Sequence, residues 1–177
     1  MFKPRRPEIL ILLLAIYIAA ALNYAFWRKL LIAAEPHNFG DWHFVVATLV
    51  AAVAALYLIL LAISYKPVIR AIVLIVLPVT AAASYFMTEY GIVIDSDMVR
   101  NIFETDTREA RDLVSLNLVA WVAILGVLPA VLFAAIPWTA QTFKAEALGK
   151  ARYAAVAAVM LVLAIFPVWG SFLSIFR

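Results

Sequence analysis

Apolar residues dominate the chain and fall into five long blocks that shorter polar stretches separate. A transmembrane helix needs about 20 consecutive apolar residues to cross a hydrocarbon layer about 30 Å thick. Five blocks meet that length: residues 9–27, 43–64, 68–87, 117–138 and 153–175. Inside hydrocarbon each backbone N–H and C=O group needs an internal partner, and for a single segment only a helix supplies it. The sequence therefore predicts an all-α polytopic membrane protein with five transmembrane helices.

A highly charged stretch interrupts this pattern between the third and fourth blocks. Residues 89–112 carry seven acidic and three basic side chains: Glu89, Asp95, Asp97, Glu104, Asp106, Glu109, Asp112, Arg100, Arg108 and Arg111. Placing all ten charges in hydrocarbon would cost about 25 to 35 kcal/mol on the helix-insertion scale. The stretch is therefore predicted to lie at the boundary between the membrane and water.

The charged stretch also has the features of a helix. Asp95 and Ser96 can cap the start of a helix, and neither glycine nor proline follows Ser96 before Gly126. Helical spacing places the apolar residues on one side: Val99, Ile102, Phe103, Ala110 and Leu113. Asp106 is a charged residue on the same side. We therefore expect an amphipathic interfacial helix over about residues 96–113.

A polar stripe runs along this predicted helix, away from its apolar side. Asn101, Thr105 and Glu109 recur at intervals of four residues, which places them on one face. A carboxylate can pair with an ammonium group while an amide and a hydroxyl bond to phosphate or ester oxygens, so the stripe suits an ammonium-bearing head group. A solvated face, stabilised by pairs such as Glu104 with Arg108, explains the same spacing.

Composition narrows the possible chemistry. Hydrophobic residues make up 67% of the chain and charged residues 14%, with a mean hydropathy of +1.03, which excludes an ordinary soluble domain. The chain has no cysteine, which excludes disulfides, thiolate nucleophiles and cysteine metal ligands. His37 and His43 are the only histidines, so we expect no metal or other cofactor in this chain.

The charges predict an orientation. Five crossings put eight basic and two acidic residues on one face: Lys3, Arg5, Arg6, Lys66, Arg70, Lys144, Lys150, Arg152, Glu8 and Glu146. The other face has a net charge of −3. The positive-inside rule therefore puts the N-terminus in the cytoplasm and the C-terminus on the periplasmic side. The five tryptophans lie near predicted span ends, as in an interfacial aromatic belt: Trp27, Trp42, Trp121, Trp138 and Trp169.

The first block resembles a cleaved signal peptide in part, because basic residues precede it and Ala19, Ala20 and Ala21 resemble a cleavage site. The apolar run continues to Trp27, however, so we interpret it as a true span.

Short connections and prolines predict some of the packing. The link around Lys66 and Pro67 is so short that we expect the second and third spans to form an adjacent antiparallel pair. Prolines interrupt the last three spans at Pro78, Pro129 and Pro167, and each leaves a backbone carbonyl for a neighbour to satisfy. Alanines at 51, 52, 54 and 55 can allow a close helix approach in the second span, although alanine is also a common filler of transmembrane helices.

Three motifs carry a resemblance to a known family: TEYGIVIDSDMVRNIFETDTREARDL around the charged stretch, VLPA in the fourth span and FPVWGSFLSIFR at the end of the fifth. With them the whole chain resembles the N-terminal membrane domain of lipid A phosphoethanolamine transferases of the EptA and MCR type. These enzymes take phosphoethanolamine from phosphatidylethanolamine through a threonine in a zinc-containing periplasmic domain. They then pass it to lipid A, which weakens polymyxin binding.

The resemblance implies specific residues, partners and a place in the cell. The family's head-group asparagine, threonine and glutamate correspond to Asn101, Thr105 and Glu109. The implied partners are phosphatidylethanolamine, lipid A and the protein's own soluble domain in the bacterial inner membrane, and no nucleic acid is expected. Because the sequence stops at Arg177, before the catalytic zinc domain of the family, we expect no catalytic residue here and no activity from this chain alone.

Two other classes of function remain as alternatives. In the first, the chain is a structural scaffold that only docks and positions the soluble domain. The second, a small transporter or channel, is disfavoured because the interiors of the predicted spans lack ionisable residues that could line a pathway.

Overall fold

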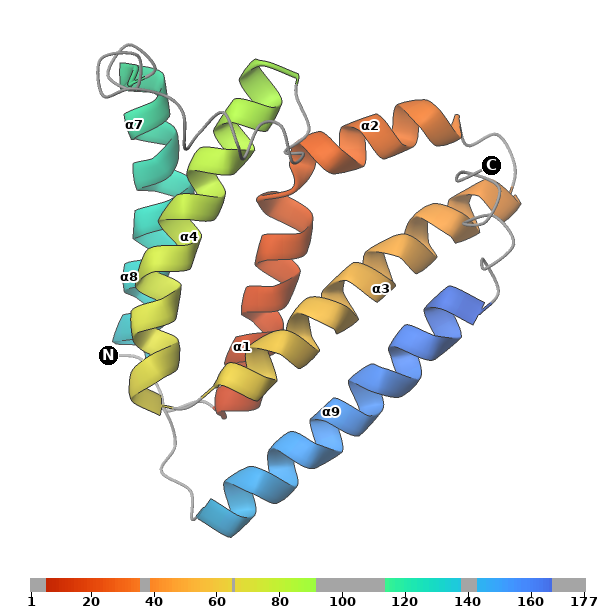
Figure 1. Cartoon of the computed structure of the whole chain (residues 1–177), viewed down its shortest axis with the longest axis vertical. Helices are drawn as coiled ribbons and strands as arrows, with labels where there is room; N and C mark the ends of the chain where they lie inside the picture. Colours follow the sequence, from red (N-terminus) through yellow and green to blue (C-terminus); the bar gives the residue numbers. More distant parts are fainter. Residues whose placement is uncertain (1–5, 36–38, 65, 92–113, 138–142, 167–177) are drawn as a thin grey trace, which may run out of the picture.

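The computed structural model describes residues 6–35, 39–64, 66–91, 114–137 and 143–166. In these ranges the regular elements are all helical, in agreement with the predicted all-α class (Figure 1). Their bounds are α1 Pro7–Ile16, η1 Tyr17–Ala21, α2 Tyr24–Ala34, α3 Phe39–Ile63, α4 Lys66–Glu89, α7 Leu116–Val122, η2 Ala123–Val127, α8 Leu128–Ala135 and α9 Phe143–Ile165.

The described helices provide four stretches that are long and apolar enough to cross a membrane, in α3, α4, α7–η2–α8 and α9. A fifth crossing exists if α1, η1 and α2 together count as one span, although the axis turns by 56° between η1 and α2. The predicted interfacial helix over residues 96–113 lies outside the described residues.

The bend in the first apolar block was not predicted. It falls at Leu22 and Asn23, inside the expected span 9–27. Side chains bond the carbonyls that the helix leaves open there: the Asn23 amide donates to the Ile18 oxygen at 2.8 Å, and the Trp27 indole donates to the Ala19 oxygen at 2.6 Å. A broken helix is tolerated at membrane depth only where such partners exist.

The last described helix also differs from its predicted span. α9 begins at Phe143, ten residues before the expected residue 153, and its first turns are polar. There the Lys150 ammonium and the Glu146 carboxylate form an ion pair of 3.1 Å with helical i, i+4 spacing. Hydropathy marks the part of a helix that suits hydrocarbon, and a helix can extend beyond that part.

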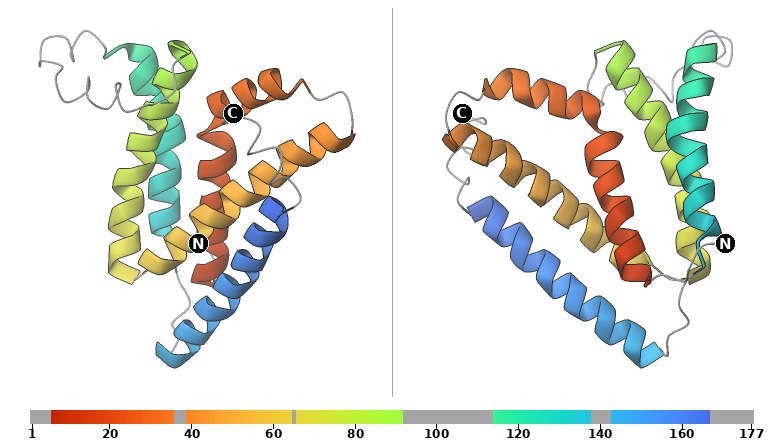
Figure 2. Two further views of the ribbon diagram at one scale, coloured as in Figure 1. Left: turned by 45° about the vertical axis from the view of Figure 1, so that its right-hand side comes forward. Right: turned by 180° about the vertical axis from the view of Figure 1, so that it is seen from behind.

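The helices form two groups that share one end (Figures 1 and 2). α3 packs along α9, whereas α4 packs along α7, η2 and α8. α3 and α4 meet mainly where they are joined, so the prediction of an adjacent antiparallel pair is wrong. A short connection fixes only the positions of two helix ends, and the fit of side-chain surfaces decides which helices then pack together. We name the joined end the Ser64 end and the opposite end, where α4 stops and α7 starts, the Glu89 end.

Small residues lie at helix contacts in both groups. Ala47 of α3 is buried with Ala164 of α9, and Ala51 packs against them. In the other group, a Cβ atom added to Gly126 would lie 2.7 Å from the Pro78 Cα atom, so only glycine fits there. Helix association in membranes depends on such close backbone approach, as the alanines of the second span suggested.

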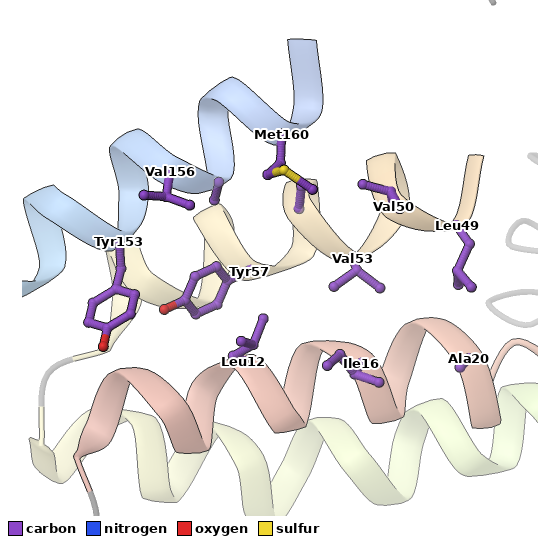
Figure 3. Close-up of a pocket in the computed structure, with 12 residues that line it drawn as sticks. Leu12, Ile16, Ala20, Leu49, Val50, Val53, Tyr57, Tyr153, Val156 and Met160 are labelled. Atoms are coloured by element: carbon purple, nitrogen blue, oxygen red, sulfur yellow. The ribbon is translucent and has the colours of Figure 1, made fainter. Parts of the chain in front are cut away.

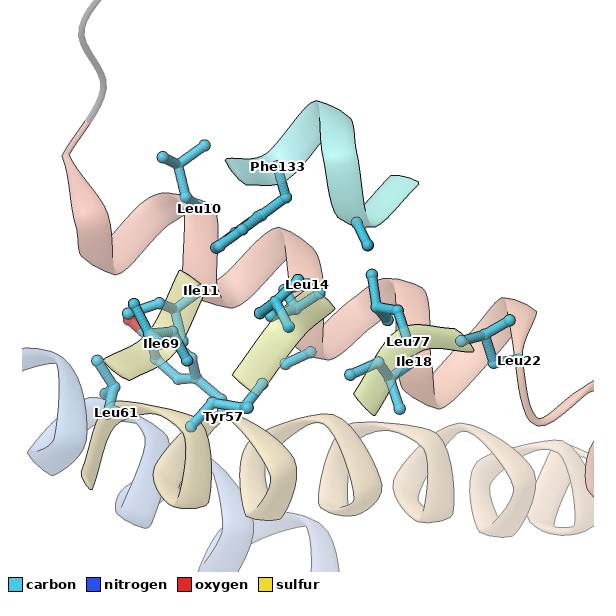
Figure 4. Close-up of a cluster of buried hydrophobic side chains, with 14 of the residues drawn as sticks. Leu10, Ile11, Leu14, Ile18, Leu22, Tyr57, Leu61, Ile69, Leu77 and Phe133 are labelled. Carbon is cyan, nitrogen blue, oxygen red and sulfur yellow. The ribbon is translucent and has the colours of Figure 1, made fainter. Parts of the chain in front are cut away.

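Helix α1 lies between the two groups and joins them into one core (Figure 4). Its Ile11 side chain is fully buried, as is Ile69 of α4, and Tyr57 of α3 and Phe133 of α8 belong to the same cluster. Tyr17 also repairs the defect at Pro129, which has no N–H to donate to the Leu125 carbonyl. The Tyr17 hydroxyl donates to that oxygen at 2.6 Å. The expected repair of a proline interruption by a neighbour is confirmed at this position.

Candidate functional site

The predicted head-group residues Asn101, Thr105 and Glu109 lie outside the described residues. The chain leaves α4 before this segment and enters α7 after it, so both flanks of the segment belong to the Glu89 end. The flanks are tied together there by a hydrogen bond of 3.1 Å between the hydroxyls of Tyr85 and Ser115.

Ser115 also starts α7. Its backbone is extended, and its side-chain oxygen accepts a hydrogen bond of 3.1 Å from the Leu118 N–H, which makes it the N-cap of the helix. One serine therefore both begins the helix and joins it to α4. This double role fixes the spacing of α4 and α7 at the Glu89 end.

A groove of about 450 Å³ lies between these helix ends, and we call it the α4–α7 groove. Its lining contains polar, aromatic and aliphatic side chains: Tyr85, Thr88, Glu89, Asn117, Ala120, Trp121, Ile124 and Leu125. The polar groups Glu89 and Asn117 are exposed. The aliphatic groups come from later turns of α7 and η2, deeper in the apolar stretch. The groove therefore has a polar part and an apolar part, as a site for an amphiphile requires.

Aromatic rings form part of the groove lining. Tyr85 and Trp121 pack edge to face with ring centroids 6.0 Å apart. The Trp121 indole N–H is buried and has no hydrogen-bond partner among the described residues. Carboxylates and aromatic faces both attract cations, so the groove can take up a cationic group.

The other side of the α4 terminus has a basic contact. Gly91 follows the end of α4 with φ +64°, a left-handed conformation that favours glycine. The Lys29 ammonium of α2 donates to the Gly91 oxygen at 2.5 Å. Sequence reasoning missed this contact because it depends on the bend at Asn23, which brings α2 alongside the end of α4.

A second groove, of about 500 Å³, lies between α1, α3 and α9 (Figure 3). Aliphatic side chains line most of its length, among them Leu12, Val53 and Met160, and the rings of Tyr57 and Tyr153 lie at one end. The Tyr57 hydroxyl is engaged with the Glu8 backbone oxygen at 3.2 Å. The groove suits hydrocarbon and offers no arrangement of groups for catalysis.

Polar groups at the Ser64 end mostly bond to backbone oxygens. Lys150 donates to the Ser64 oxygen at 2.7 Å, and Arg70 donates to the Ile136 oxygen at 3.3 Å. Both contacts place a cation at carbonyls near a helix C-terminus, where the helix dipole favours positive charge. Glu8 is the exception, since it is 1% exposed and one of its carboxyl oxygens has no partner among the described residues. A Cβ atom at Gly149 would lie 2.9 Å from its other oxygen.

Metal ligands do not gather in the part of the chain that the structure describes, where no three histidine, cysteine, aspartate or glutamate side chains form a group that could hold an ion.

Comparison with known proteins relates the chain to one enzyme family. The family model described as phosphoethanolamine transferase EptA/EptB matches residues 52–177. Phosphatidylethanolamine transferase Mcr-2 of Escherichia coli is 32% identical over 173 residues, which cover 97% of this chain and 31% of the relative. Kdo(2)-lipid A phosphoethanolamine 7''-transferase of Escherichia coli K12 is 30% identical over 125 residues, which cover 68% of this chain and 22% of the relative.

The fold matches a solved structure as well. The integral membrane protein lipooligosaccharide phosphoethanolamine transferase A (EptA) from Neisseria meningitidis aligns with a TM-score of 0.91 and 24% identity. The alignment covers 99% of this chain and 33% of the other. The matches to Mcr-2 and to the Neisseria protein cover nearly all of this chain. The chain thus spans about a third of the length of these two proteins.

Proposed function

The chain belongs to the phosphoethanolamine transferase EptA/EptB family, and on this premise we propose that it anchors such an enzyme in the membrane and presents its lipid donor. The donor is phosphatidylethanolamine, and the acceptor is lipid A, so the complete enzyme would confer polymyxin resistance. The observation that supports this role best is the α4–α7 groove, which combines a carboxylate with an aromatic and aliphatic lining at the end of two membrane-spanning helices.

The proposed topology has five spans in the bacterial inner membrane, with α1–η1–α2 as the first. The N-terminus is cytoplasmic, and the Glu89 end, the interfacial helix and the C-terminus face the periplasm. The excess of basic residues at the Ser64 end supports this orientation. Because the chain has no native cysteine, single cysteines at Ser115 and Gln141 test it directly. We expect labelling from the periplasm at the first and from the cytoplasm at the second, and the reverse pattern would overturn the orientation.

The catalytic step is assigned to a soluble periplasmic domain that the family carries beyond this part. Zinc in that domain would stabilise charge at phosphorus while a threonine hydroxyl attacks. In this chain the proposed contribution is substrate binding alone: Asn101, Thr105 and Glu109 contact the donor head group. We place the catalytic residues and the metal ligands of the complete enzyme in that soluble domain.

Replacement of Asn101 and Glu109 by alanine in the complete enzyme tests the head-group role. We expect transfer of phosphoethanolamine to lipid A to fall by about tenfold or more, since each change removes a hydrogen bond to a charged group. The matched control replaces Glu104, which lies off the stripe. Unchanged transfer at normal expression would remove Asn101 and Glu109 from the site.

A structural scaffold is the second candidate. The hydrogen bonds that Lys150 and Arg70 donate at the Ser64 end favour it, because they stabilise helix ends without forming a ligand-binding site. The two candidates differ in lipid preference. A donor-presenting domain binds phosphatidylethanolamine in preference to phosphatidylglycerol, whereas a scaffold has no such preference.

A further inference from the structure

We propose that the α4–α7 groove binds the primary ammonium group of a phospholipid, with the Glu89 carboxylate as its acceptor and Tyr85 and Trp121 as its aromatic wall. This inference rests on the proposed function, which names the lipid donor. It goes beyond that function by adding an ammonium acceptor on α4 and an aromatic wall from α4 and α7 to the head-group contacts proposed for the polar stripe.

Glu89 is placed where its own charge is unfavourable. It is the last residue of α4, where the negative end of the helix dipole and the open carbonyls already concentrate negative potential. Its carboxylate has no ion pair or hydrogen bond among the described residues. The neighbouring cation Lys29 is engaged with the Gly91 oxygen instead. A positively charged ligand at Glu89 would relieve this concentration of negative charge.

The aromatic side chains add a second attraction for the same charge. Tyr85 and Trp121 pack against each other and both line the groove. An ammonium group near the face of such a ring is attracted by the ring quadrupole, and the attraction grows when water is excluded. Glu89 lies one helical turn from Tyr85 on α4, so the carboxylate and the ring belong to the same side of the helix.

The remaining lining identifies the ligand as a lipid. Asn117, one turn before Trp121, is exposed and can donate to the phosphate oxygens that accompany the ammonium group. Ile124 and Leu125 continue the groove along the apolar stretch of α7 and η2. A zwitterionic head group at Glu89 and Asn117 therefore leaves its acyl chains beside aliphatic side chains in hydrocarbon.

Native mass spectrometry of the detergent-solubilised protein tests the site with three lipids that share acyl chains. Phosphatidylethanolamine has three ammonium N–H donors, phosphatidylcholine has a cation without N–H donors, and phosphatidylglycerol has no cation. We expect the protein to prefer phosphatidylethanolamine by about tenfold, the size of one hydrogen bond to a charged group. Glu89→Gln should reduce this preference several-fold, whereas Glu89→Asp should retain most of it. Glu35→Gln, at an exposed glutamate next to α2, is the matched control and should keep the preference.

The outcomes separate this inference from the proposed function. If the unmodified protein binds the three lipids equally, the donor-presenting function fails and the inference fails with it. If the unmodified protein prefers phosphatidylethanolamine and Glu89→Gln keeps that preference in full, the inference alone is overturned. Soluble phosphoethanolamine added in competition distinguishes the ligand source: displacement at concentrations equal to the lipid would assign the groove to a free head group and overturn the lipid assignment.

Discussion

The two ends of the helical bundle differ in the partners of their charged side chains, apart from Glu8 at the Ser64 end and Lys29 at the Glu89 end. At the Ser64 end, Lys150 and Arg70 bond to backbone oxygens of neighbouring helices, and Lys150 also pairs with Glu146. At the Glu89 end, Glu89 and Trp121 line one groove, and the Glu89 carboxylate has no hydrogen-bond partner among the described residues, nor has the buried Trp121 indole N–H. Polar side chains that have hydrogen-bond partners within the protein stabilise its fold. A polar side chain without such a partner, at the edge of a groove, can bind a ligand instead. The contrast predicts that changes at the two ends will affect different measurements.

The largest loss of stability is expected for a change at Gly126, between the α4–α7 groove and the core. Gly126→Ala places a Cβ atom 2.7 Å from the Pro78 Cα atom and 3.0 Å from the Ala81 Cβ atom, so α4 and η2 must move apart. Overpacking of this kind costs about 1–3 kcal/mol. Thermal unfolding in detergent should show the loss, and lipid preference should weaken because the groove wall shifts. Ala123→Leu adds atoms at an exposed position of the same turn and should have neither effect.

Lys150→Met should lower the free energy of unfolding by about 2 kcal/mol, because it removes the charge-assisted hydrogen bond to the Ser64 oxygen. The midpoint of thermal unfolding should fall while lipid preference stays the same. Lys144→Met is the matched control, since Lys144 is exposed on the same helix, and its effect should stay within about 0.5 kcal/mol. A changed lipid preference in Lys150→Met would contradict the division between the two ends.

The smallest loss of stability is expected for Ser115→Ala, which removes the N-cap of α7 and the hydroxyl that bonds to Tyr85. A lost cap costs about 1 kcal/mol. Because Ser115 joins the two walls of the groove, lipid preference should decline along with the unfolding temperature. Ser115→Thr retains the hydroxyl and should restore both properties. Normal binding in Ser115→Ala would show that the groove does not depend on this link.

Much of the fold was predictable because it follows from the length and hydropathy of apolar blocks. The blocks at 43–64, 68–87 and 117–138 coincide closely with α3, α4 and α7–η2–α8. The bend at Asn23 was not predictable, since it depends on the Asn23 and Trp27 side chains finding particular carbonyls. The packing of α4 against η2 includes the close contact of Gly126 with Pro78, two residues that are 48 positions apart in sequence.

The candidate site was predictable only in part. Glu89 appeared in the sequence as one charge of a long acidic stretch, and Trp121 as one member of an aromatic belt. Nothing in their spacing showed that they line the same groove, because α4 and α7 come together through packing between distant segments. Asn101, Thr105 and Glu109 remain predictions, since they lie outside the described residues.

The hydrogen bond between Tyr17 and the Leu125 carbonyl has a consequence for how the protein is made. Synthesis proceeds from the N-terminus, so Tyr17 leaves the ribosome 108 residues before Leu125. The group that satisfies the carbonyl left open by Pro129 is therefore already in the membrane when that helix inserts. A circular permutant that moved the first helix to the end of the chain would expose this carbonyl to hydrocarbon during biogenesis, even though its finished fold would contain the same contact.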